Sequence, residues 1–154
     1  RIGVRMILDK KFQNLEYIGR GPMENYSDRK RGFDVGVYKN TVAGLMTPYE
    51  KPMDAGNHED VRWVKITDAE GNGMKATADG SLLQFTAIPY TDEVMEETEY
   101  RVDLPESEST VLCLSCRTLG VGSASCGPKP LNQYIIYASP VKFTYLIQLL
   151  AENK

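Results

Sequence analysis

The chain has 154 residues, of which 42% are hydrophobic and 25% are charged, and its formal net charge is −3. This length fits one domain over residues 1–154, large enough to bury its own core. The basic residues are dispersed, so the sequence excludes the electrostatic pattern of a nucleic-acid partner. Because no apolar stretch approaches the ~20 residues of a membrane-spanning helix, no membrane partner is expected either.

Short segments rich in Val, Ile, Tyr, Phe and Thr alternate with Gly, Pro, Asn and Asp, which is typical of an all-β fold. Turn chemistry predicts a hairpin at Asp68–Gly73, since Gly and Asn adopt positive φ. One short helix is expected within Tyr90–Thr98, capped by Thr91 or Asp92. Strands are expected at Gly3–Leu8, Asn14–Ile18, Val35–Thr41, Val61–Asp68, Met74–Asp79, Leu82–Ile88, Thr98–Leu104, Val111–Thr118, Gln133–Ala138 and Val141–Leu149.

The alternation within the last strand indicates how the strands pack. Phe143, Tyr145, Ile147 and Leu149 share one face, whereas the opposite face carries Leu146 and Leu150 among polar residues. Both faces therefore have apolar groups, as expected where two sheets stack. The sequence predicts one β-sandwich-like domain without an internal repeat.

Cys113 and Cys116 form a C-x-x-C pair, which raises the question of a zinc or redox site. Both fall in an expected strand, where residues three apart point to opposite faces. Zinc needs further ligands, so we interpret the two cysteines as small buried hydrophobic residues. With Cys126 the count is odd, which predicts no disulfide framework and leaves the redox compartment open.

His58 is the single histidine and lies in the polar run Asn57–Asp60. Such a cluster is a candidate for binding a sugar or a cation. A lone loop histidine more commonly faces solvent, and we predict that His58 is exposed.

Glu24 and Asp28 lie four residues apart in a loop opened by Gly21 and Pro22. A glycosidase needs two carboxylates ~5–9.5 Å apart across the scissile bond. These two share one segment rather than two rigid elements. We therefore interpret the loop as structural, held by its own polar side chains.

The stretch Leu119–Pro130 is rich in Gly and Pro and predicts a shaped surface loop. Ser123, Ser125 and Cys126 offer hydroxyl and thiol groups that suit a polyol. Composition favours a functional and a structural interpretation of this loop equally.

Three quoted segments resemble, in order and spacing, the C-terminal domain (domain five) of bacterial β-galactosidases of glycoside hydrolase family two. They are "YIGRGPMENYSDRKRGFDVGVY" (Tyr17–Tyr38), "TPYEKPMDAGNHEDVRWVKITDAEGNG" (Thr47–Gly73) and "VLCLSCRTLGVGSASCGPKP" (Val111–Pro130). The resemblance implies an antiparallel β-supersandwich that is galactose mutarotase-like. The chain begins at Arg1 without Met or an apolar leader, which fits a fragment of a longer protein of cytoplasmic or periplasmic location.

The resemblance also implies where the chemistry of such an enzyme lies. The catalytic glutamates and the ligands of Mg²⁺, with Na⁺ as a further candidate, belong to a separate (β/α)₈ barrel domain. This chain then carries no catalytic residue and no cofactor, and Glu24 and Asp28 match scaffold positions. Its partners are that barrel and the β-galactoside, and the full-length enzyme is a candidate homo-oligomer.

In several members of the family the Gly-rich loop reaches the barrel, where a tryptophan stacks on the sugar. Here the loop is one residue shorter and has Cys126 at that place, and a thiol lacks the flat face of an aromatic ring. The resemblance implies Gly122, Ser123, Ser125 and Cys126 as substrate-binding residues at the pocket edge. The alternatives are an independent carbohydrate-binding module that uses the His58 loop, and a purely structural interdomain domain.

Overall fold

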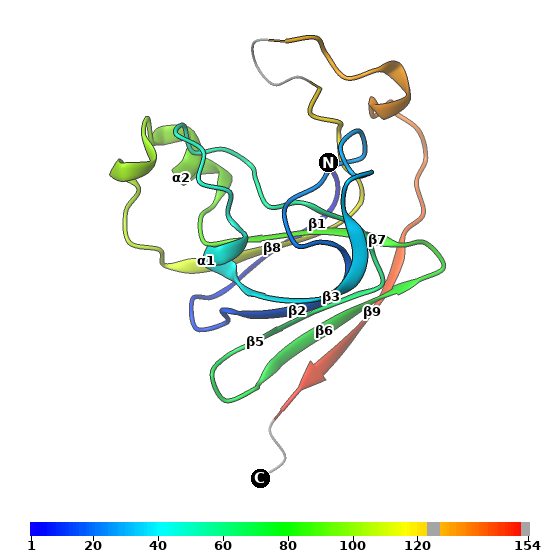
Figure 1. The fold of residues 1–154 in the computed structure, drawn as a ribbon. Helices are drawn as coiled ribbons and strands as arrows, with labels where there is room; N and C mark the ends of the chain where they lie inside the picture. The colour runs from blue at the N-terminus through cyan, green and yellow to red at the C-terminus, as the bar shows by residue number, and fades with distance from the viewer. Residues whose placement is uncertain (123–126, 152–154) are drawn as a thin grey trace.

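A computed structural model of the chain, which describes residues 1–122 and 127–151, consists of two antiparallel β-sheets (Figure 1). The strand order is β1-β8-β7-β4 in the first sheet and β3-β2-β5-β6-β9 in the second. The prediction of an all-β sandwich is confirmed. The strands are β1 (Ile2–Asp9), β2 (Asn14–Gly21), β3 (Asp34–Thr41), β4 (His58–Val61), β5 (Trp63–Thr67), β6 (Gly73–Asp79), β7 (Leu83–Ile88), β8 (Ser109–Arg117) and β9 (Thr144–Leu150).

The core lies between the two sheets and is built from alternate residues of their facing strands. Tyr17 and Val64 enter it from the second sheet, and Phe85 and Leu112 enter it from the first, each at most 1% exposed. A smaller cluster lies on the outer side of the first sheet and includes Met95 of the helix α2 (Asp92–Glu97).

Local signals placed two of the predicted elements correctly. The hydroxyl of Thr91 caps α2 by accepting a hydrogen bond from the Val94 amide, as the capping pattern predicts. The hairpin between β5 and β6 turns at Gly71, whose φ of 85° favours glycine. A second short helix, α1 (Val42–Leu45), was not predicted. No helix among the described residues is long and apolar enough to span a membrane.

The prediction of one strand over Val61–Asp68 is wrong, because the chain changes sheets within it. Val61 pairs with Leu83 in the first sheet, whereas the Arg62 amide donates to the Ile18 carbonyl of the second. The backbone turns at Asp60, whose φ is 53°. Strands β4 and β5 therefore connect the two sheets. Strand β4 carries most of the Asn57–Asp60 run and places the His58 ring against the core residues Tyr17 and Phe85.

The predicted strands over Thr98–Leu104 and Gln133–Ala138 are also wrong. A 3₁₀ turn lies within the first segment, at Arg101–Asp103, and another overlaps the start of the second, at Asn132–Tyr134. The backbone of the first segment bonds to a loop rather than to a strand, since the Arg101 amide donates a hydrogen bond to the Glu50 carbonyl. Strand-like composition is insufficient here because neither segment lies beside a sheet edge that pairs with it within the described residues.

Candidate functional site

The loop between β2 and β3 is fixed by the carboxylate of Glu24, which is 7% exposed. This carboxylate accepts hydrogen bonds from the Arg29 guanidinium at 2.7 Å, from the Gly56 amide at 2.8 Å and from the Tyr49 hydroxyl. Burial by itself would raise the pKa of Glu24, but the bonds from Tyr49, Gly56 and Arg29 outweigh it and lower that pKa. The prediction that the loop is held by its own polar side chains is confirmed for the Glu24–Arg29 pair, whereas Tyr49 and Gly56 bind Glu24 from outside the loop.

Asp28 differs from Glu24 because its carboxylate binds the start of the Gly-rich loop, which is distant in sequence. Its carboxylate accepts hydrogen bonds from the amides of Val121 at 3.1 Å and Gly122 at 2.8 Å. A Cβ at Gly120 would lie 2.7 Å from the Asp28 carboxylate, so glycine permits the close approach. The two loops that the sequence singled out separately are therefore joined at Asp28.

Of the residues predicted to bind substrate, the structure places only Gly122. It lies at the base of the Gly-rich loop with a φ of 62°. The Tyr134 carbonyl accepts a hydrogen bond from the Gly120 amide and fixes the base from the other side. Ser123, Ser125 and Cys126 lie outside the described residues.

The prediction that His58 is exposed is wrong, since its side chain is 0% exposed and lies in β4. The ring stacks on Phe85 with 5.2 Å between centroids and lies beside Tyr17 at 4.7 Å. Its Nδ1 is 3.0 Å from the Arg20 carbonyl and 3.1 Å from the Tyr17 hydroxyl. Burial lowers the pKa of His58 to about 4, so the ring is neutral at pH 7.

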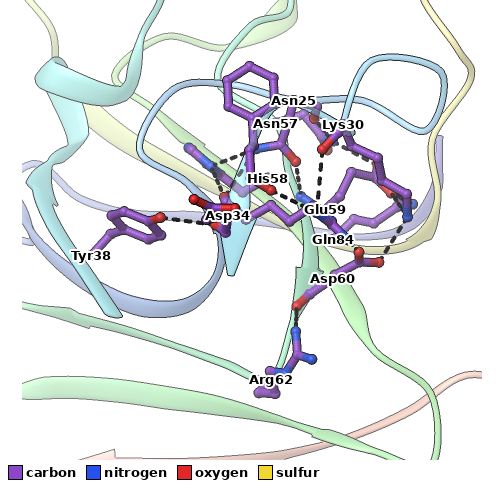
Figure 2. Close-up of polar contacts among 12 residues, drawn as sticks. Asn25, Lys30, Asp34, Tyr38, Asn57, His58, Glu59, Asp60, Arg62 and Gln84 are labelled. Carbon is purple, nitrogen blue, oxygen red and sulfur yellow. Dashed lines mark hydrogen bonds and ion pairs between the residues drawn. The ribbon is translucent and has the colours of Figure 1, made fainter. Parts of the chain in front are cut away.

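Figure 2 shows how the residues around His58 connect several elements through Glu59. The Glu59 carboxylate, 2% exposed, accepts from Gln84 of β7 at 2.9 Å and from Thr118, directly after β8, at 3.1 Å. Asn57 donates to it at 3.1 Å. Burial raises the pKa of Glu59 despite these bonds. The sequence identified the cluster around His58 but not Gln84 or Thr118, which no local pattern marks.

Asn25 ties the Glu24 loop to this buried cluster. Its side-chain carbonyl accepts from the Glu59 amide at 2.8 Å, while its own backbone carbonyl accepts from the Asn57 side chain at 2.7 Å. At the outer side, the Lys30 ammonium contacts Asp60 at 2.9 Å (Figure 2). The polar residues of the cluster are therefore bound to one another and act as a scaffold for the Asp28 loop.

An open pocket of about 390 Å³ lies beside this scaffold. Charged, amide and hydroxyl groups meet apolar ones around it, a mixture that suits a polar ligand with an apolar face. Its lining residues are Ser27, Gln84, Arg117, Thr118, Gln133, Tyr134, Ile135 and Ile136.

The C-x-x-C pair lies on β8, as predicted. Cys113 is buried in the small outer cluster, and Cys116 points the other way, with its thiol 3.4 Å from the Ile2 carbonyl. Across the part of the chain that the structure describes, no group of three or more His, Cys, Asp or Glu side chains forms a candidate metal site.

Replacing Asp28 by Asn tests the connection between the two loops. The loss of a charged acceptor weakens two hydrogen bonds, so we expect the amides of Val121 and Gly122 to exchange roughly tenfold faster. Residue-resolved hydrogen exchange measures this. Asp34→Asn is the control, because the Tyr38 hydroxyl contacts the Asp34 backbone carbonyl rather than its carboxylate. Equal exchange in both variants would contradict the connection.

Comparison with protein families matches residues 1–147 to the family described as Beta galactosidase small chain. The chain is 34% identical over 139 residues to a beta-galactosidase of Priestia megaterium, covering 90% of this chain and 13% of that protein. It is 32% identical over 133 residues to beta-galactosidase BgaC of Bifidobacterium adolescentis, covering 85% and 13%. For a beta-galactosidase of Actinobacillus pleuropneumoniae the identity is 33% over 145 residues, covering 94% and 14%.

Proposed function

Because this chain belongs to the beta-galactosidase small-chain family, we propose that it is a non-catalytic accessory domain of a retaining β-galactosidase. The complete enzyme belongs to glycoside hydrolase family two, with this chain in its C-terminal domain five. It hydrolyses terminal non-reducing β-D-galactosides through a covalent glycosyl-enzyme, as in lactose catabolism. The observation that carries the proposal is coverage, since the chain spans only 13–14% of the length of three relatives named beta-galactosidase.

The proposal places the catalytic glutamates, together with Mg²⁺ and the candidate Na⁺, in a barrel domain elsewhere in the polypeptide. The carboxylates of Glu24 and Glu59 are almost fully buried and already accept several hydrogen bonds. Neither is placed to take up a second role as a ligand of a cation that prefers open oxygen atoms. Glu24 and Glu59 therefore fit a scaffold role better than a role as metal ligands.

The loop that begins at Gly122 supplies one edge of the sugar pocket in this proposal. Asp28 and Tyr134 hold its base, so the loop starts from a fixed point. Apolar side chains around the base are exposed, at 49% for Leu119 and 68% for Leu131. These side chains suit burial against the barrel. A mutarotase-like supersandwich and a homo-oligomeric complete enzyme remain parts of the proposal.

The proposal predicts that the purified chain does not hydrolyse a chromogenic β-galactoside, whereas the complete polypeptide does. Absorbance of the released nitrophenol at matched molar concentration measures both. Turnover by the chain alone would refute the accessory role. A purely structural role predicts instead that Ser125→Ala and Cys126→Ala leave kcat and KM of the complete enzyme unchanged.

The pocket beside Gln84 and Arg117 favours one alternative, an independent carbohydrate-binding module. Titrating galactose and lactose into the chain by calorimetry separates the two functions. The accessory role predicts almost no binding, because most of the sugar pocket lies in the barrel. Sub-millimolar binding that Arg117→Ala weakens would support the module instead.

A further inference from the structure

The sandwich is open on the side where β1 and β9 lie. These two strands stand at the ends of their sheets in the described residues, each with a neighbour on one side. Both contribute to one groove of about 440 Å³. Its lining is almost entirely apolar and includes Leu8, Phe12, Ile66, Met74, Leu149 and Leu150.

The side chains of β9 that point toward the interior are exposed. Ile147 lies opposite Ala76, and residues that face each other across a strand pair share a face of the sheet. Ala76 belongs to the core and is 1% exposed. Ile147 is nevertheless 47% exposed, and Leu149 on the same face is 82% exposed. The core therefore continues to β9 without being covered there.

The facing strand β1 shows the same feature. Val4 lies opposite Leu114, which is fully buried in the core, yet Val4 itself is 43% exposed. The other side of the sandwich is closed, since Val61 at the far edge of the first sheet is 0% exposed. The exposure of Val4 and Ile147 therefore shows that the core is uncovered on one side of the sandwich, and not that it is poorly covered everywhere.

The edge of β9 also lacks the features that keep strands from pairing. Free edges in natural proteins commonly carry charged residues or proline. The sequence of β9 is TYLIQLL and has neither. The edge strand β3 of the same sheet carries Asp34 and Lys39, and β1 carries Arg5 and Asp9. Strand β9 has the character of an interior strand, with apolar groups on both faces.

We propose that a β-strand of the same polypeptide, from outside residues 1–154, pairs with the free edge of β9 and covers the groove with apolar side chains. This rests on the proposed function, in which the chain is part of a longer hydrolase. Relatives that match 85–94% of this chain are several times longer than it, so a longer polypeptide of this kind has further segments that could supply the strand. A core-facing surface needs a permanent partner, which a covalently linked strand provides.

Hydrogen exchange of the complete polypeptide tests the pairing at residue resolution. In an edge strand alternate amides point away from the sheet, whereas in a strand paired on both sides all amides are bonded. We expect every amide of β9 to exchange at least about tenfold more slowly than an unprotected amide. Alternating fast and slow amides along β9 would overturn the proposal. If the protection of β9 disappears when the polypeptide is diluted to monomers, the pairing strand belongs to a second copy and the proposal of a linked strand is overturned.

Substitutions on the two faces of β9 give a second measurement. Ile147→Asp places a charge in the covered groove, so we expect a clearly lower urea midpoint for the complete polypeptide. Leu146→Asp is the matched control, because Leu146 lies on the outer face of the same strand and is 61% exposed. Equal midpoints would count against a covered groove. Neither hydrogen exchange nor the urea midpoint depends on galactoside hydrolysis. A failure of the strand proposal is therefore distinguishable from a failure of the proposed function, which the hydrolysis assay tests.

Discussion

Replacing Glu24 by alanine is expected to lower the free energy of unfolding of the chain by about 3 kcal/mol. The carboxylate accepts hydrogen bonds from the buried Gly56 amide and the buried Tyr26 hydroxyl, as well as from the half-buried Tyr49 hydroxyl, and each unsatisfied buried donor costs about 1–3 kcal/mol. Arg29 adds little to this loss because its side chain is 49% exposed and regains water. Urea unfolding at pH 7, followed by the fluorescence of Trp63, measures the change.

Glu16→Ala is the matched control for this prediction. Glu16 also contacts two cations, Lys65 at 3.2 Å and Lys39 at 3.7 Å, but these pairs lie at the surface of the second sheet. Surface ion pairs contribute about 0–1 kcal/mol, so the control is expected to lose less than a third as much stability as Glu24→Ala. Similar losses in both variants would show that the hydrogen bonds of Glu24 do not hold the loop.

The stability of the chain is expected to fall as the pH is lowered from 6.5 to 4, because of His58. Burial lowers the pKa of His58 from 6.5 to about 4 in the folded state. The unfolded chain therefore binds the proton first, and the stabilising effect of the neutral ring is complete above pH 6.5 and lost as the pH falls toward 4. The full effect is about 3 kcal/mol.

Other buried acids do not reproduce this change. The raised pKa of Glu59 acts in the opposite direction, since the folded state then takes up a proton first. The lowered pKa values of Glu24 and Asp60 reduce stability as the pH falls below the ordinary values of 4.5 and 3.8, so Glu24 adds to the effect of His58 only at the acidic end of the interval. His58 is the single histidine, so its ring resonances in an NMR titration report the pKa directly. A pKa near 6.5 would contradict the buried, neutral ring.

Comparing the chain with a His58→Phe variant isolates the contribution of the ring to pH dependence. The phenylalanine side chain keeps an aromatic ring against Phe85 and Tyr17 but cannot titrate. The difference in unfolding free energy between the two proteins is expected to change by about 3 kcal/mol between pH 6.5 and pH 4. A constant difference across this interval would assign the pH dependence to other groups.

Much of the fold was predictable because its signals are local. The alternation in β9, the glycine at position 71 and the capping hydroxyl of Thr91 each act within a few residues. The resemblance of three sequence segments indicated a β-galactosidase domain, and residues 1–147 match the beta-galactosidase small-chain family. The strands expected at Thr98–Leu104 and Gln133–Ala138 failed because pairing partners, rather than composition, decide whether such segments form strands.

By itself, the sequence determined the all-β class, the family and the positions of the polar loops, since periodicity and motif spacing are properties of neighbouring residues. Only the tertiary structure decided that His58 is buried, that Asp28 reaches Gly122, and that the side of the sandwich beside β9 is open. Each of these depends on contacts between segments far apart in the chain. Burial and charge pairing follow from which surfaces meet, and local patterns do not specify that.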